Sequence, residues 1–263
     1  MSHDAVEVAR YNMSLPLRSS QEGMARQDEY QADHVANICV AYRVLGICSL
    51  LQDANMEEFA ELLCKAGQAR HHLLTLARTQ PLPAERLPGS DNVGFSDALT
   101  AGDMATARAI AGLSANRYQE GLEYEEDFLF SHFLQQMLGV PRDTDALHGV
   151  LAHWETVLEG GLDPRREACL ALLQKDADGF SAAFEALVIE RKREFSESRR
   201  RLDFDAEVGA TTGQLYVDGL ALLRVAELEG LPPSPPFEFA PALARVPANT
   251  PLPRADAWKE SLE

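Results

Sequence analysis

The sequence predicts an all-α protein: a globular bundle of stacked antiparallel helix hairpins with no substantial sheet. Apolar residues recur with the helical period along almost the whole chain, and no stretch alternates cleanly between apolar and polar residues. Residues that start and stop helices stand between the periodic segments. The chain has 263 residues, of which 46% are hydrophobic and 25% charged, so it can bury a sizeable core and is too apolar to be mainly disordered.

Two long helices are predicted near the N-terminus. The first covers residues 21–52, and its second half is apolar on nearly every side, as is typical of a helix at the centre of a bundle. The second covers residues 56–79. Asn55 precedes it and Glu58 follows three residues later, an arrangement that resembles a capping box.

Prolines and glycines within residues 81–94 then interrupt the helical pattern. This break is a candidate subdivision of a domain that otherwise spans residues 1–263. After it, residues 95–113 predict two short helices hinged at 101–103.

Further helices are predicted over residues 124–138, 144–158, 165–175, 179–199 and 214–229. Their ends carry recognisable signals. The glycines at 160–161 end one helix, and Asp163 with Pro164 starts the next, with a side-chain acceptor at the cap and proline in the first turn. Gly230 ends the last helix, and the Pro-rich tail 232–263 is predicted to be irregular.

A weak internal repeat is visible in the order helix, Asp-bearing turn, helix. Residues 98–113 resemble residues 171–187, and residues 50–63 are a more distant third copy. The Asp side chain can accept the free amide hydrogens at the start of the second helix. The pattern suggests stacked helix pairs, although any helix hairpin would share it.

The net charge of -17 constrains the choice of partner. It argues against general nucleic-acid binding, which needs clustered Lys and Arg, and it favours fast association with a basic protein. Acidity of this kind is also common among cytosolic bacterial proteins that need no basic partner.

A cytoplasmic, membrane-free location is expected. Residues 1–12 show no apolar region of a secretory signal. The densest apolar run, residues 35–51, carries Arg43 near its middle and is therefore a poor membrane span. Four cysteines lie in apolar helical contexts without metal or redox spacing and are predicted to be buried: Cys39, Cys48, Cys64 and Cys169.

No catalytic residue, cofactor or metal site is predicted. The seven His residues do not form a ligand set, and the chain carries no nucleophile elbow, phosphate loop or zinc-protease motif. An enzyme whose catalytic side chains come together only in the folded protein, without a sequence motif, stays an alternative.

The candidate partner-binding residues form two acidic groups. The first surrounds Tyr124 and comprises Glu120, Glu123, Glu125, Glu126 and Asp127. It has two interpretations: a solvated first turn of a helix, where negative charge is favoured, or a patch that meets Lys and Arg of a partner beside aromatic anchors.

The second group, Asp203, Asp205 and Glu207, follows the basic run 199–201. Pairing between these neighbours in an exposed connector is the competing interpretation. The basic residues within 191–201 alternate with Glu at helical spacing, which favours an exposed helix with internal ion pairs over a nucleic-acid surface.

Three segments carry a resemblance to a known family. They are EYEEDFLFSHFLQQML at 123–138, ALLQKDADGFSAAFEALVIERKREF at 171–195, and LYVDGLALLRVAELEGL at 215–231 with the aromatic, Pro-containing tail. The chain resembles the all-helical immunity proteins of bacterial polymorphic toxin and type VI secretion systems, of the Imm49 type. The tail departs from the family pattern at 237–241.

The resemblance implies a cytoplasmic protein without catalysis that binds and neutralises a cognate toxin. Such toxins are frequently nucleases, and a nuclease presents a basic cleft that an acidic inhibitor can occupy. Two other hypotheses remain: an all-helical enzyme, and a helical-repeat scaffold that binds peptides in a concave groove.

Overall fold

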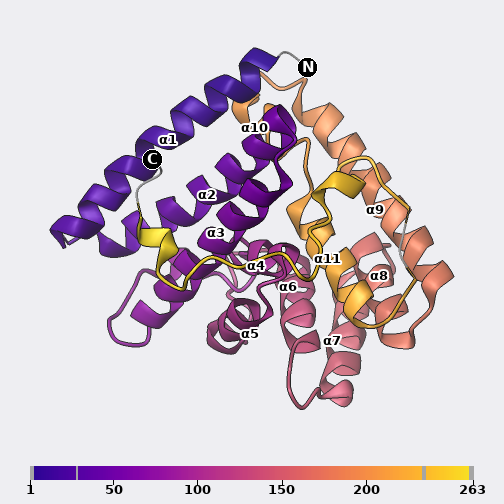
Figure 1. Cartoon of the computed structure of the whole chain (residues 1–263). Coiled ribbons are helices and arrows are strands. Elements are labelled where there is room, and N and C mark those ends of the chain that lie inside the picture. The colour runs from indigo at the N-terminus through magenta and orange to yellow at the C-terminus, as the bar shows by residue number, and fades with distance from the viewer. Residues whose placement is uncertain (1–2, 28, 233–234, 261–263) are drawn as a thin grey trace.

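The computed structural model describes residues 3–27, 29–232 and 235–260. In this part of the chain the protein forms eleven α-helices and three short 3-10 helices, and no strand, which confirms the all-α prediction (Figure 1). The α-helices are α1 (His3–Arg26), α2 (Gln31–Asp53), α3 (Met56–Leu76), α4 (Phe95–Ala101), α5 (Met104–Leu113), α6 (Glu125–Met137), α7 (Thr144–Val157), α8 (Pro164–Gln174), α9 (Ala177–Ser198), α10 (Ala206–Ala210) and α11 (Val217–Leu228).

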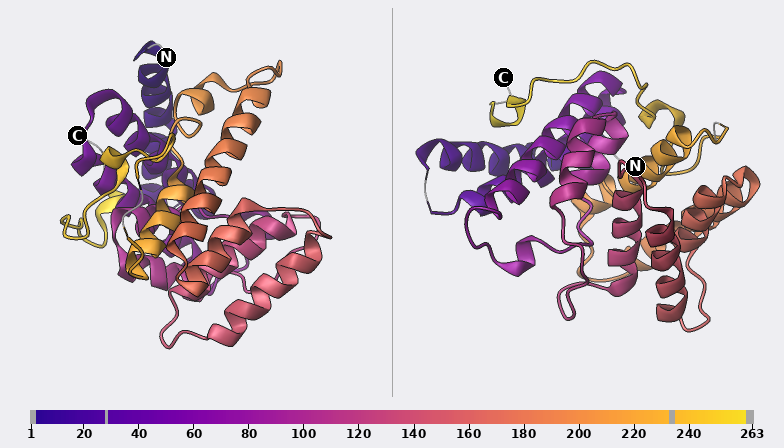
Figure 2. Two further views of the ribbon diagram at one scale, coloured as in Figure 1. Left: turned by 90° about the vertical axis from the view of Figure 1, so that its right-hand side faces the viewer. Right: turned by 90° about the horizontal axis from the view of Figure 1, so that it is seen from below.

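Helix pairs that follow one another in the chain pack side by side. α2 packs against α1 and α3, α8 against α9, and α6 against α7 (Figure 1). α3 also contacts α4 and α5 across the break at residues 81–94, and α11 contacts α4 and α6. The two further views in Figure 2 show α1 to α3 on one side of the molecule and α7 to α9 on the other.

α2 lies at the centre of the N-terminal helices, as its uniform hydrophobicity predicts. Val35, Ile38 and Ile47 are fully buried. α2 is long and apolar enough to cross a membrane by length and composition, and its packing between α1 and α3 accounts for that composition. Its one central charge, Arg43, is paired with the buried Asp97 of α4 at 2.8 Å.

Two predictions about the helices were wrong. The single helix predicted over residues 21–52 is two helices, because the chain reverses after α1, where Gln27 takes a positive φ of 54°. α1 also begins at His3, although the mixed composition of residues 3–20 and Pro16 among them gave little helical signal. The five-residue helix α10 was missed because it is too short to show a period. The other predicted helices are confirmed to within a few residues at each end.

Side-chain caps explain the repeated hairpin pattern. The carboxylate of Asp103 accepts the amide hydrogen of Thr106 at 3.0 Å, and that of Asp176 accepts from Gly179 at 3.0 Å. In the third copy the cap is Asn55, which accepts from Glu58 at 3.1 Å. The Asp of that turn, Asp53, instead pairs with Arg10 of α1.

The Pro-rich tail returns to the N-terminal helices (Figure 1). Trp258 is 2% exposed and packs in one core cluster with residues of α2 and α3. The Tyr42 hydroxyl donates to the Trp258 carbonyl at 3.0 Å, and the Gln68 amide donates to the Arg254 carbonyl at 3.0 Å. The tail is irregular apart from two short 3-10 turns among its described residues, yet it helps to cover the core.

The four cysteines are buried and free, as predicted. Burial raises the pKa of the Cys48 thiol to about 11 and that of Cys64 to about 12. A thiol with so high a pKa holds little of the reactive thiolate at neutral pH, so these side chains behave as small hydrophobic groups.

Candidate partner-binding site

The first acidic group lies at the start of α6. Glu125, Glu126 and Asp127 occupy its first turn, where the helix dipole favours negative charge. Tyr124 stands at the N-cap position with 78% of its surface exposed, and Glu120 is exposed in the preceding loop. Tyr124, Glu126 and Asp127 all line one cavity.

Glu123 has a structural role within the chain. One of its carboxylate oxygens accepts the backbone N–H of Ser90 at 2.6 Å, and the other accepts that of Gln119 at 3.0 Å. The carboxylate therefore ties the loop before α6 to the segment before α4. This use was invisible in the sequence, because it joins residues 33 positions apart.

Replacing Glu123 with Gln should therefore destabilise the fold. The amide group presents one N–H₂ where the carboxylate presented an acceptor, so one backbone donor loses its partner, at a cost of about 1–3 kcal/mol. Urea unfolding monitored by circular dichroism would measure the loss. The exposed Glu120→Gln is the matched control and should leave the midpoint unchanged. Equal midpoints for the two variants would contradict the structural role of Glu123.

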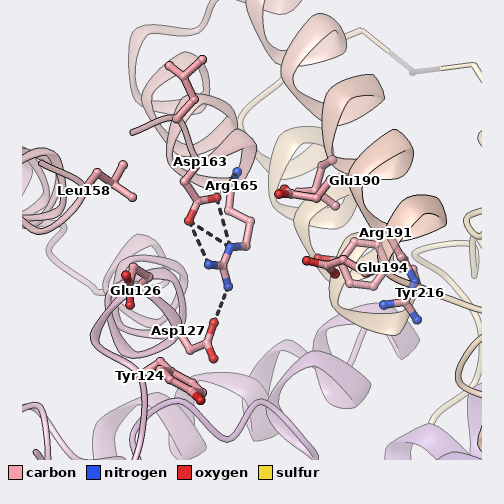
Figure 3. Close-up of a pocket in the computed structure, with 12 residues that line it drawn as sticks. Tyr124, Glu126, Asp127, Leu158, Asp163, Arg165, Glu190, Arg191, Glu194 and Tyr216 are labelled. Carbon is pink, nitrogen blue, oxygen red and sulfur yellow. Dashed lines mark hydrogen bonds and ion pairs between the residues drawn. The ribbon is translucent and has the colours of Figure 1, made fainter. Parts of the chain in front are cut away.

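Two other acids of this group also have partners inside the chain. The Glu125 carboxylate lies 2.8 Å from His153 Nε2 of α7, and the Asp127 carboxylate lies 2.5 Å from a terminal nitrogen of Arg165. Glu126 forms no ion pair with any described residue and points to the cavity (Figure 3).

The second acidic group is used locally and lies elsewhere. Asp203 pairs with Arg201 at 2.8 Å, and Asp205 caps α10 by accepting from the backbone of Glu207 and Val208. The Glu207 side chain accepts from Asn12 of α1 at 2.5 Å. α10 packs on α1, whereas α6 packs on α5, α7 and α8, so the two groups do not form one surface (Figure 1).

A cavity of about 500 Å³ opens between α6, α8 and α9, and we call it the acidic cavity (Figure 3). Its lining comprises Tyr124, Glu126, Asp127, Leu158, Leu162, Asp163, Arg165, Leu187, Glu190, Arg191, Glu194 and Tyr216. Five carboxylates thus face two guanidinium groups, and the cavity keeps an excess of negative charge. Of this lining, the sequence predicted only the residues of the α6 side.

Arg165 holds the α6 and α8 sides together. Asp163 caps α8 by accepting the backbone N–H of Arg165 at 2.8 Å, and its carboxylate also accepts from the Arg165 guanidinium at 2.8 Å. A second guanidinium nitrogen reaches Asp127, as the dashed lines in Figure 3 show. The guanidinium lies 5.7 Å and 5.9 Å from the ring centres of Phe130 and Trp154. Burial alone would lower the pKa of Arg165, but the two carboxylates outweigh it and raise the pKa, so Arg165 stays charged.

The α9 side carries Glu190, Arg191 and Glu194. Glu190 and Glu194 stand one helical turn apart, and the pKa of Glu190 is raised by burial first and then by repulsion from Glu194 and Asp163. Arg191 stacks over the Tyr216 ring at 4.4 Å and donates to the Thr212 carbonyl at 2.5 Å. It forms no ion pair with a described residue, and burial lowers its pKa.

Apolar side chains are exposed beside these charges. Leu162, in the loop before α8, is 89% exposed, and Tyr124, at the start of α6, is 78% exposed. Among residues 3–27, 29–232 and 235–260, no group of three or more His, Cys, Asp and Glu is placed to hold a metal ion. The arrangement is therefore a negatively charged hollow with exposed apolar contacts on its rim.

Comparison with known proteins adds no relative: no family model, no curated protein and no solved structure matches this chain. The resemblance to immunity proteins therefore stays a prediction from the sequence.

Proposed function

We propose that this protein binds and neutralises a basic partner protein by stoichiometric complex formation at the acidic cavity. The observation that carries the proposal is the excess of carboxylates in that cavity. Glu126 and Glu194 have no ion-pair partner among the described residues, and mutual repulsion contributes to the raised pKa of Glu190. A positively charged group from outside would relieve this repulsion and gain attraction to several carboxylates at once.

A protein side chain suits the cavity better than a free cation does. The lining combines carboxylates with Leu158, Leu162 and Leu187, and Lys and Arg carry a cationic head on an apolar stem. The exposed Tyr124 and Leu162 would contact the partner around that side chain. Aromatic and apolar anchors beside charged groups are typical of protein interfaces.

The partner we propose is a cognate antibacterial toxin, with a nuclease as the favoured class. A nuclease binds phosphate with a basic cleft, and an acidic inhibitor offers that cleft the same charge as its substrate. The net charge of -17 would accelerate the encounter. In this proposal the protein acts in the cytoplasm of the producing cell and needs no cofactor.

Reversing two unpaired carboxylates of the cavity tests the proposal. We expect the double variant Glu126→Lys and Glu194→Lys to associate at least about tenfold more slowly with the proposed cognate toxin domain, and with weaker salt dependence. Surface plasmon resonance at several salt concentrations measures both. Glu185→Lys is the matched control, because Glu185 is exposed on the same helix and lies outside the cavity lining.

Two outcomes would contradict the proposal at different levels. If co-expression of this protein does not rescue cells from a toxin encoded by an adjacent gene, the immunity function is wrong. If co-expression rescues but the double variant binds like the Glu185→Lys control, the protein is an inhibitor that uses another surface. Melting temperatures of both variants should stay close to that of the wild type, because Glu126 and Glu194 form no ion pair with another described residue.

A further inference from the structure

A second charged hollow lies on another part of the surface, around the end of α5. It consists of two adjoining cavities of about 690 Å³ and 390 Å³ that share Ala111, Gly112, Ser114, Ala115 and Asn116. We call the two together the arginine groove. Arg70 and Arg78 line the first cavity, and Arg108 lines the second. No Asp or Glu lines either one, in a chain whose net charge is -17.

Two of the three arginines keep their charge uncompensated. Arg70 is buried and paired with Asp91 at 2.9 Å. Arg78 is exposed and donates to the Leu113 carbonyl at 3.4 Å, and Arg108 is also exposed. Neither arginine forms an ion pair within the part of the chain that the structure describes. Arg78 in the first cavity and Arg108 in the second thus present guanidinium groups without an ion-pair partner among the described residues.

Two further titratable groups lie beside the groove, and neither presents a carboxylate to its lining. Burial lowers the pKa of His132, which lines the second cavity and shares a 2.6 Å hydrogen bond with Gln136, so the ring is neutral at pH 7. Glu123, which bonds to the backbone of Gln119 at the edge of the first cavity, also accepts from Ser90. Its carboxylate is therefore engaged in two hydrogen bonds within the chain.

The walls of the groove are apolar between the arginines. The first cavity is lined by Leu74, Leu82, Leu87 and Leu113, and the second by Leu138 and Val140, which is 83% exposed. The groove therefore offers sites for apolar side chains next to sites for carboxylates. An inorganic anion would use only the second kind.

We infer that the arginine groove binds an acidic peptide segment of a partner protein, lying in extended form across the residues that the two cavities share. Its carboxylates pair with Arg78 and Arg108, and its apolar side chains enter the leucine-lined cavity. At physiological ionic strength charges beyond about 8 Å are screened, so the local arginines outweigh the acidity of the rest of the chain. A nucleic acid would bring far more negative charge than two guanidinium groups neutralise.

This inference does not rest on the proposed function, because the acidic cavity and the arginine groove share no residue. The test uses the full chain and a fluorescein-labelled short peptide of alternating Glu and Leu. Fluorescence anisotropy at low and high salt should show saturable binding that weakens with salt. A Glu–Ser peptide should bind more weakly, because it lacks the apolar contacts. A Lys–Leu peptide matches the acidic cavity instead, so its binding should not change when Arg78 or Arg108 is reversed.

Charge reversal locates the site. We expect Arg78→Glu and Arg108→Glu each to weaken binding of the Glu–Leu peptide about tenfold. The matched control, Arg18→Glu with Arg200→Glu, changes two exposed arginines that lie outside the groove and should leave the affinity unchanged. Absence of binding at low salt would overturn the inference, and so would equal affinity of the groove and control variants. Complete displacement of the peptide by citrate, added at a concentration that supplies the same number of carboxylates as the peptide, would also overturn it. The last outcome would assign the groove to small anions.

Discussion

The variant Asp97→Ala is expected to lose about 3–5 kcal/mol of stability, because it breaks a buried ion pair. Asp97 is fully buried and accepts two hydrogen bonds from Arg43 Nε, at 2.8 Å and 3.0 Å, as well as the backbone N–H of Gly94 at 2.5 Å. Removing the carboxylate leaves the Arg43 guanidinium buried and short of its main counter-charge. Burial by itself would lower the pKa of Arg43, but Asp97, aided by Asp218, raises it, so the arginine keeps its charge in the folded protein.

A double variant distinguishes the loss of the Arg43–Asp97 ion pair from a loss of packing. Arg43→Met combined with Asp97→Leu replaces both charges by apolar groups of similar size and should recover much of the stability, because no buried charge is then left unpaired. Arg201→Ala, which breaks the exposed pair with Asp203, should leave the urea midpoint nearly unchanged. If Asp97→Ala unfolds at the same urea concentration as Arg201→Ala, the central role of the buried pair is wrong.

Trp154→Ala should cost about 3–5 kcal/mol, because it leaves a large void in the main core. Trp154 is fully buried, its ring centre lies 6.4 Å from that of Phe130, and it lies beside the guanidinium of Arg165. The indole N–H has no hydrogen-bond partner among the described residues. Trp154→Phe therefore removes no polar contact and should cost much less than Trp154→Ala.

Chemical unfolding of both Trp154 variants checks the order of their stabilities. Trp154→Ala also removes one of the two rings beneath Arg165, so it should weaken association at the acidic cavity more than Trp154→Phe does. If the Ala and Phe variants are equally stable, the void is refilled by neighbouring side chains and the packing argument fails. Unfolding should be followed by circular dichroism, because the substitution removes one of the two tryptophans on which fluorescence depends.

The helices that were predicted well share a local cause. Asp103, Asp163 and Asp176 begin their helices through hydrogen bonds to amides two or three residues further along the chain, so the signal lies within a few residues of sequence. α10 has the same kind of cap in Asp205, but its five residues are too few to show a helical period. α1 carries Pro16 and a mixed composition, and it is held by packing against α2 and α10.

The acidic cavity was only half visible in the sequence for the same reason. The acids around Tyr124 stood out as a cluster, but their surroundings depend on residues from α8, α9 and the start of α11. Asp127 meets Arg165 across 38 positions of the chain, and Arg191 stacks on Tyr216 across 25. The sequence also made Glu123 a candidate for contact with a partner, whereas the fold uses its carboxylate to anchor a loop.

Composition, helical period and capping residues by themselves determined the fold class, most helix positions and the burial of the four cysteines. These properties follow from the burial of apolar side chains and from hydrogen bonds between near neighbours. Both can be predicted from short stretches of sequence. The tertiary structure alone decided which carboxylates are neutralised and which stay unpaired at a cavity. It also decided that the tail covers α2 and α3, and that three arginines line the arginine groove, which no Asp or Glu lines. Charges act through space, so their partners emerge only when distant segments are folded together.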